Sequence, residues 1–318
     1  MFSLLFHPRA TITFAPVFLA FPPLMPAAQN PLSELRRQID EIDSALHDLI
    51  MRRTEIVQEI AAVKGRSNGT FLHLPGREAE VIRRLIRRHR GAFPKPVLVR
   101  IWRELISALI RLQGPFALAV YAPDERLTYW DLARDHYGAL TTIVGHASAG
   151  QVVSAVTEGS ASIGVLPMPE QDDRDPWWRA LVGNDPKLPR VVARLPFGTG
   201  SQRGEPREAL AIGLVAPEMT GHDRSLLVIE TMREISRSAL KTTLTGLGFE
   251  PALLQAWREP SGSDRRLYLI EIAGFSVPDD PRLTRLVEEH REDVAQVWRI
   301  GGYAVPLTAE ELGLAKRA

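Results

Sequence analysis

The chain has 318 residues, which is enough for two or three domains, and its 45% hydrophobic and 24% charged residues are typical of a globular protein. Its formal net charge of +1 excludes the strong positive field that draws a protein to nucleic acid or to an anionic membrane. The absence of cysteine excludes disulfides, thiolate catalysis and cysteine-ligated zinc, and leaves the compartment undecided.

The first thirty residues form an apolar, proline-rich segment with few basic groups. Its prolines interrupt any helix, so the segment is too broken to span a membrane. We expect a disordered tail, or a start codon assigned too early, and a cytoplasmic protein. The alternative is a signal peptide cleaved near Ala28, which would direct the protein to the periplasm or the exterior.

Residues 31–64 have the periodicity of one long amphipathic helix. Apolar residues recur at three- and four-residue spacing and share one face: Leu35, Ile39, Ile42, Leu46, Leu49, Ile56, Ile60 and Val63. Arg53 and Lys64 interrupt this face, and because eleven positions correspond to about 20° of net rotation, both point into the same seam. Two cations in an apolar seam are costly unless an anion joins them. This helix is therefore predicted to hold a small anion.

Two shorter helices are predicted next, one beginning near Pro75 and one from Val97 to about Leu112. Three helices cannot bury the seam of so long a first helix, so we expect an intertwined helical dimer. The arginine-rich run at 83–90 is interpreted as the solvated face of the second helix. No aromatic residues interleave with it, which argues against a nucleic-acid site.

The motifs PLSELRRQIDEID, LIMRR, AAVK, GRE and RIWRELISALIRLQ follow one another between residues 31 and 113. This pattern resembles the all-helical chorismate mutase domain. The resemblance implies a domain-entwined homodimer that converts chorismate to prephenate. It also implies the following site residues: carboxylate-binding Arg36 of the partner subunit, Arg53 and Arg77; hydroxyl-binding Glu78; and Lys64 and Gln113 at the ether oxygen.

The rearrangement of chorismate is pericyclic and needs no nucleophile, base, metal or cofactor. It is accelerated by clamping two carboxylates in a reactive conformer and by stabilising negative charge on the breaking ether oxygen. Bidentate arginines suit the first task, and a lysine with an amide suits the second.

After Gly114 the sequence alternates between predicted strands (116–122, 141–144, 163–166 and 191–195) and predicted helices (129–137 and 149–158). The stretch VSAVTEGSASIGVLPMPE resembles the first lobe of prephenate dehydratase. A mutase domain followed by this lobe is the order found in the bifunctional mutase–dehydratases.

The dehydratase motifs are altered in this chain. The family's Thr-Arg-Phe corresponds to Ala193-Arg194-Leu195, which replaces a hydroxyl by a methyl group, and Met168-Pro169-Glu170 stands in place of a Glu-Asn pair. Between Glu170 and the strand at 191 there is room for one short helix and a polar loop, and not for a second lobe. We interpret this region as a degenerate dehydratase-like α/β lobe without dehydratase activity.

The region 223–310 is predicted to have a βαββαβ order, typical of a ferredoxin-like unit. It resembles the ACT regulatory domain, which binds phenylalanine in dehydratases. The family's Gly-Ala-Leu is Ser238-Ala239-Leu240 here, and its Glu-Ser-Arg-Pro is Trp257-Arg258-Glu259-Pro260. Because the glycine that lets the backbone approach an amino acid is missing, a dimerising or structural role is expected, with an amino-acid effector as the alternative.

The sequence thus predicts a multi-domain protein: a tail (1–30), an all-α three-helix chorismate mutase domain (31–113), a short α/β lobe (114–222), a ferredoxin-like α+β ACT-like domain (223–310) and a C-terminal tail (311–318). The predicted function is that of a chorismate mutase in phenylalanine and tyrosine biosynthesis, without cofactor, metal, nucleic acid or membrane. Two alternatives stay open: a bifunctional chorismate mutase/prephenate dehydratase, and a non-catalytic regulator of the pathway.

Overall fold

The computed structural model describes residues 30–66, 73–123, 128–171, 173–198, 207–258 and 264–314, without the side chains of residues 64–66. The chain divides into two units, Met1–Glu55 and Ile56–Ala318. Of the predicted tails at 1–30 and 311–318, residues 1–29 and 315–318 lie outside the described residues. Within the described part of the chain, no helix is long and apolar enough to cross a membrane.

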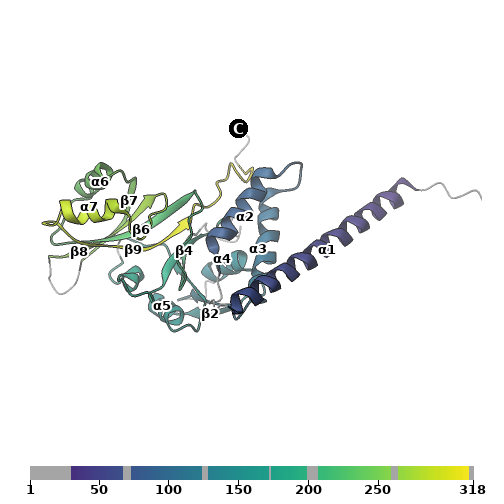
Figure 1. Cartoon of the computed structure of the whole chain (residues 1–318), viewed down its shortest axis with the longest axis horizontal. Helices are drawn as coiled ribbons and strands as arrows, with labels where there is room; N and C mark the ends of the chain where they lie inside the picture. Colours follow the sequence, from purple (N-terminus) through teal and green to yellow (C-terminus); the bar gives the residue numbers. More distant parts are fainter. Residues whose placement is uncertain are drawn as a thin grey trace, which may run out of the picture. The chain divides into compact units, whose positions relative to one another are not determined.

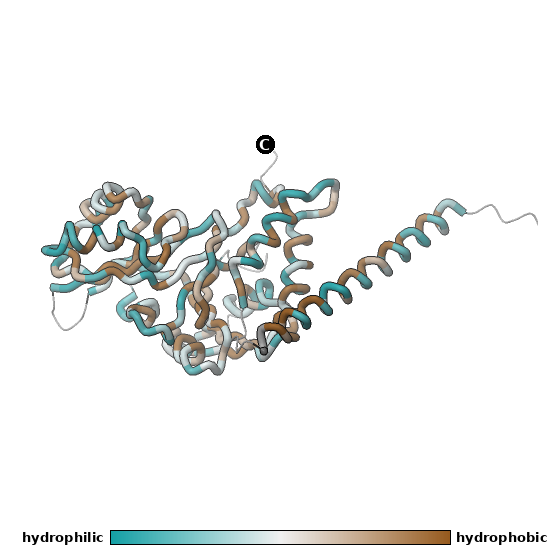
Figure 2. Tube along the Cα trace, viewed as in Figure 1, coloured by the Kyte–Doolittle hydropathy of each residue, from teal (hydrophilic) through white to brown (hydrophobic). Residues whose placement is uncertain are grey.

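The first helix, α1, runs over Pro31–Arg66, as its periodicity predicted (Figure 1). At its start the Asn30 side chain accepts a hydrogen bond from the Leu32 N–H at 3.1 Å, which satisfies one of the free donors of the first turn. The predicted apolar face is present but exposed, from Leu35 at 56% to Val63 at 65% (Figure 2). A face this apolar and this open is typical of a helix that packs on another chain.

Two helices follow α1: α2 (Pro75–Arg88) and α3 (Lys95–Arg111). Each begins with a proline in its first turn. The N–H groups of a first turn have no acceptor within the helix, so a proline there removes no helical hydrogen bond. Both belong to the second unit, and their buried faces join one hydrophobic core with the α/β lobe. That shared core includes Ile82, Ile106 and Ile110 from the helices and Leu118 and Val120 from the lobe.

The described part of the second unit contains one nine-stranded sheet in the order β2-β1-β3-β5-β4-β9-β6-β8-β7. The lobe contributes β1 (Ala117–Tyr121), β2 (Thr142–His146), β3 (Ile163–Pro167), β4 (Arg190–Leu195) and β5 (Ala209–Gly213). Strand β1 is parallel to both β2 and β3, whereas β5 is antiparallel to β3 and β4. Strand β5 was not predicted, because ALAIG consists mostly of small residues and lacks the polar alternation that marks a strand.

Helices cover both faces of the lobe. The side chains of Leu118 and Val120 point to the face covered by α2, α3 and α4 (Thr128–Tyr137), while Ala119 points to the opposite core. That opposite core contains α5 (Ala149–Thr157) and the short helix η1 (Trp177–Leu181). A capping box of Ser148 and Gln151 begins α5. The lobe is thus a layered α/β structure, as predicted.

The last part of the sheet has the predicted βαββαβ order. Its elements are β6 (Asp223–Thr231), α6 (Arg237–Gly246), β7 (Pro251–Arg258), β8 (Arg266–Ala273), α7 (Pro281–Glu289) and β9 (Val294–Ala304). Helices α6 and α7 contribute to one core on one face of these strands (Figure 1).

The lobe and the ferredoxin-like unit join through one contact between parallel strands. Strand β4 meets β9 only at Val191 and Gly301 in the described sheet. Gly301 has φ +148°, and a Cβ built there would lie 2.3 Å from the Val191 carbonyl oxygen. Only glycine therefore lets the two strands approach this closely.

Candidate functional sites

The six predicted mutase residues are divided between the two units. Arg36 and Arg53 lie on α1 in the first unit, and Arg36 is exposed whereas Arg53 is half-buried. Lys64 belongs to the last turns of α1 in the second unit, but its side chain lies outside the described residues. The second unit also holds Arg77, Glu78 and Gln113.

Arg77 and Glu78 stand in the first turn of α2, and their side chains have different surroundings. Arg77 is exposed and forms an ion pair with Glu80 at 3.1 Å, and its backbone N–H donates to Glu218 at the same distance. Glu78 is buried, so the two neighbours point to solvent and to the core, respectively.

The Glu78 carboxylate lies between two cationic or titratable groups. Arg103 of α3 donates to one carboxylate oxygen at 2.9 Å, and His73 Nε2 lies 2.9 Å from the other. Burial lowers the pKa of Arg103, and the negative charge of Glu78 opposes that shift. Because breaking a buried pair leaves an uncompensated charge, Glu78 is an anchor between α2 and α3 in this structure.

Two more titratable side chains, His136 and Tyr137 at the end of α4, adjoin this cluster. Burial lowers the pKa of His136 well below its ordinary value, and the positive charge of Arg103 lowers it further. Burial raises the pKa of Tyr137, and the nearby Glu78 carboxylate adds to that rise. Both side chains are therefore neutral near pH 7.

Gln113 follows the end of α3 and is half-buried. Its side-chain amide donates to the Leu109 backbone carbonyl at 3.3 Å. The amide therefore folds back on its own helix in this structure.

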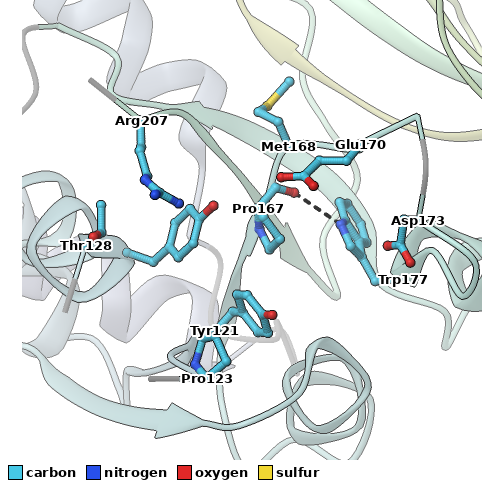
Figure 3. A pocket seen from close by; sticks show the side chains of 10 residues that line it. Tyr121, Pro123, Thr128, Pro167, Met168, Glu170, Asp173, Trp177 and Arg207 are labelled. Atoms are coloured by element: carbon cyan, nitrogen blue, oxygen red, sulfur yellow. Dashed lines mark hydrogen bonds between the residues drawn. The ribbon is translucent and has the colours of Figure 1, made fainter. Parts of the chain in front are cut away.

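A second candidate site lies in the lobe, at the carboxyl ends of the parallel strands β1 and β3 (Figure 3). This is the edge at which open α/β sheets bind ligands. The cavity measures about 460 Å³. Arg207 faces it from one side, and Glu170 and Asp173 face it from the other. The Trp177 indole N–H donates to the Pro167 carbonyl at 3.1 Å, and both residues line the cavity.

Met168 and Glu170, which the sequence places at the altered dehydratase motif, line this cavity, but its other residues were not predicted. Tyr121 ends β1 and lies next to the end of the predicted strand 116–122, and that position was an available signal, because the ends of parallel strands meet at one edge. Tyr129 and Arg207 carried no such signal, since only the fold brings them to the same cavity.

Arg194, which corresponds to the arginine of the dehydratase motif, is held by protein groups. It donates to Glu208 at 2.7 Å and to the Tyr303 hydroxyl at 3.0 Å. Burial works against its charge, but the contacts with Glu208 and Tyr303 raise the pKa of Arg194 overall. The preceding residue, Ala193, offers only a methyl group. This arginine is therefore engaged in joining β4 to its neighbours.

Comparison with known proteins gives three findings. Residues 35–114 match the family model of chorismate mutase type II. The bifunctional chorismate mutase/prephenate dehydratase of Pseudomonas aeruginosa is 29% identical over 146 residues, which cover 45% of this chain and 40% of that protein. The bifunctional enzyme of Aquifex aeolicus is 30% identical over 141 residues, covering 43% of this chain and 38% of that one.

This chain therefore matches about two fifths of the length of these curated relatives. Among solved structures, the prephenate dehydratase from Arthrobacter aurescens in complex with L-Phe covers 62% of this chain and 95% of its own, with 12% identity and a TM-score of 0.43. The described chain contains no group of three or more histidine, aspartate or glutamate side chains that could hold a metal ion. Residues 35–114 therefore resemble a chorismate mutase type II domain, in a chain that is similar over part of its length to bifunctional chorismate mutase/prephenate dehydratases.

Proposed function

We propose that this protein is a chorismate mutase that rearranges chorismate to prephenate in the biosynthesis of aromatic amino acids. The observation that carries this proposal is the family match over residues 35–114, which contains all six predicted site residues. The helical character of α1, α2 and α3 agrees with it.

The proposed mechanism uses only charges and hydrogen bonds. Arg53 and Arg77, with Arg36 of the partner subunit, hold the two carboxylates of the substrate in the conformer that reacts. Lys64 and Gln113 stabilise the negative charge that develops on the ether oxygen as its bond to carbon breaks. In this mechanism the Glu78 carboxylate accepts a hydrogen bond from the substrate hydroxyl. That role requires its carboxylate to exchange at least one of its present partners, His73 and Arg103, for the substrate.

We propose further that the active form is a homodimer. The apolar face of α1 supports this proposal, because large side chains such as Leu46 and Leu49 are more than half exposed in the single chain. A second copy of α1 would bury such a face, and a dimer would bring Arg36 of the partner subunit to the site.

The same lobe that resembles a dehydratase is proposed not to dehydrate prephenate. Ala193 lacks the hydroxyl of the family motif, and Arg194 is occupied by Glu208 and Tyr303. The alternative is a bifunctional enzyme. Its support is the similarity of this chain to bifunctional chorismate mutase/prephenate dehydratases and the cavity at the ends of β1 and β3. A non-catalytic regulator of the pathway is the third candidate function. Separately, the ACT-like part is a candidate site for an amino-acid effector.

The test is a product analysis with purified full-length protein, made in a host that lacks its own chorismate mutase. Chorismate loss, prephenate and phenylpyruvate are followed separately. Prephenate without phenylpyruvate is the expected result. Formation of phenylpyruvate would establish the bifunctional alternative, and an unchanged chorismate concentration would leave the regulator as the better explanation.

A further inference from the structure

A large cavity of the second unit lies away from both sites described above. It measures about 610 Å³ and is lined by the segment before β4, by α7 and by β9. These elements come from the lobe and from the ferredoxin-like unit, so the cavity occupies the junction between them.

The cavity lies beside a part of β9 that pairs with a neighbouring strand on one side only. Along residues 295–299, β9 pairs with β6 on one side. On its other side β4 pairs with β9 only at Gly301, further along the strand. The edge of β9 before Gly301 is therefore unpaired within the described sheet, and its residues 295–299 line the cavity. Such an edge offers backbone groups to a ligand.

Two arginines face this space, and both are half-buried. Arg190 donates to the backbone carbonyls of Leu181, Gly183 and Arg299 at 3.2 to 3.4 Å. Arg299 donates to the Ser276 carbonyl at 3.0 Å. Neither forms an ion pair within 4.0 Å with a carboxylate of the described chain. A guanidinium has five N–H donors, so Arg299 in particular retains several for a ligand.

The two guanidinium groups also disfavour one another. Burial lowers the pKa of Arg299, and the positive charge of Arg190 lowers it further. Burial likewise lowers the pKa of Arg190. An anion placed between the two would relieve this repulsion, and a carboxylate matches the planar fork of a guanidinium.

The acidic residues of the cavity do not supply that anion. Asp280 is committed to Arg282 at 2.7 Å and to the Ser276 hydroxyl at 3.3 Å. Asp279 is exposed and forms no ion pair within 4.0 Å in the described chain. The rest of the wall is mixed: it includes the apolar side chains of Leu283, Val287 and Val297 beside the polar side chains of Asn184, Thr284 and Gln296.

We propose that this cavity binds a small carboxylate that carries an apolar group. The carboxylate lies on Arg299 and Arg190, and the apolar group packs on α7 and β9. A cavity of about 610 Å³ is in the size range of small-molecule sites, and Leu283, Val287 and Val297 offer an apolar surface within reach of it. Asp279 at the mouth would distinguish an amino acid, whose ammonium it can meet, from a carboxylate without an amine.

The test is calorimetric titration of the full-length protein with 3-phenylpropionate, its methyl ester and L-phenylalanine. We expect 3-phenylpropionate to bind at one site per chain and the ester not to bind. Arg299→Gln should weaken binding by at least about tenfold, because charge-assisted hydrogen bonds are lost. Arg285→Gln is the matched control, since Arg285 lies on α7, pairs with Glu289 and does not line the cavity.

A second variant does not depend on replacing Arg299. Thr284 is exposed on α7 and lines the cavity, so Thr284→Glu should fold normally, place a negative charge near the guanidinium groups and prevent binding. Tighter binding of L-phenylalanine than of 3-phenylpropionate, reversed by Asp279→Asn, would identify an amino acid as the ligand. Absence of binding to the unaltered protein, or binding that Arg299→Gln and Thr284→Glu leave unchanged, would overturn the proposal.

Discussion

Glu78 occupies a position where a structural role and a proposed substrate role meet. Its carboxylate contacts Arg103 and His73 in the core, and Arg103 is only 4% exposed. Glu78→Gln removes the negative charge that compensates this buried cation. We expect a loss of about 3–5 kcal/mol in the free energy of unfolding, measured by urea denaturation.

Glu80→Gln is the matched control for this change. Glu80 pairs with Arg77 at the surface, so its replacement should cost less than about 1 kcal/mol. Equal losses for the two variants would show that Glu78 is not an anchor. A raised KM for chorismate in folded Glu78→Gln protein would indicate that Glu78 also binds the substrate.

Lys64 is the residue on which the proposed catalysis depends most. In the proposed mechanism Lys64 donates to the charge that develops on the ether oxygen, so Lys64→Ala should lower kcat by about 10²–10³-fold. Lys241→Ala, at an exposed position of α6, is the control and should retain full turnover. A Lys64→Ala enzyme with normal kcat would rule out the proposed mechanism.

His136 makes the stability of the fold depend on pH. Its pKa is far below the ordinary value of 6.5 when folded, so below pH 6.5 the unfolded chain binds a proton that the folded chain does not. Stability therefore falls as the pH falls, by up to about 1.4 kcal/mol per pH unit. Denaturation at pH 6.5 and 5.5 should show this slope reduced in His136→Phe and unchanged in His47→Asn, an exposed control. A slope that His136→Phe leaves unaltered would contradict the assignment.

At the scale of elements, the contact between β4 and β9 decides how the lobe joins the ferredoxin-like unit. Gly301→Ala would force a Cβ against the Val191 backbone in addition to straining φ. Gly274→Ala, also at positive φ but with open space around it, should cost only the strain of about 1–2 kcal/mol. We expect Gly301→Ala to cost at least about 2 kcal/mol more, as overpacking does, in the free energy of unfolding. Similar losses at the two glycines would mean that the strands can separate without penalty.

A hydrophobic core shared by the lobe and the ferredoxin-like unit explains why both belong to the second of the two compact units of the chain. Trp178 is fully buried, and its indole N–H donates to Gln255 of β7 at 2.7 Å. Leu226 and Val228 of β6 share a core with Leu210 and Ile212 of β5. The lobe therefore packs against the face of the ferredoxin-like sheet opposite α6 and α7.

At the scale of the whole molecule, the apolar face of α1 exposes large side chains such as Leu46 and Leu49 in the single chain. Leu46→Glu places a charge in the centre of the predicted dimer contact. We expect the unaltered protein to elute as a dimer in size-exclusion chromatography with light scattering, and Leu46→Glu to elute as a monomer with little turnover. Gln58→Glu, an exposed substitution outside the apolar face, should remain dimeric. A monomeric unaltered protein with full activity would refute the dimer.

Local patterns in the sequence were sufficient to identify most elements. The spacing from Leu35 to Val63 predicted α1, and Pro75 marked the start of α2. Helix α3 was predicted from Val97 and begins two residues earlier, at Lys95. The alternation after residue 223 predicted the βαββαβ unit. Helix periodicity and strand alternation are properties of neighbouring residues, so they can be read without knowing what packs against them. The mutase motifs between residues 31 and 113 were also accessible, because they are local stretches of sequence, and the family model matches residues 35–114.

What only the tertiary structure decided depends on residues that are distant in sequence. The small residues of β5 form a strand because β3 and β4 supply its hydrogen-bond partners. Glu78 is buried because Arg103, on another helix, compensates its charge. Arg190 and Arg299 share a cavity because β4 diverges from β9 before Gly301. Periodicity carries no information about such pairings, since they follow from strand order and from the close approach that a single glycine permits.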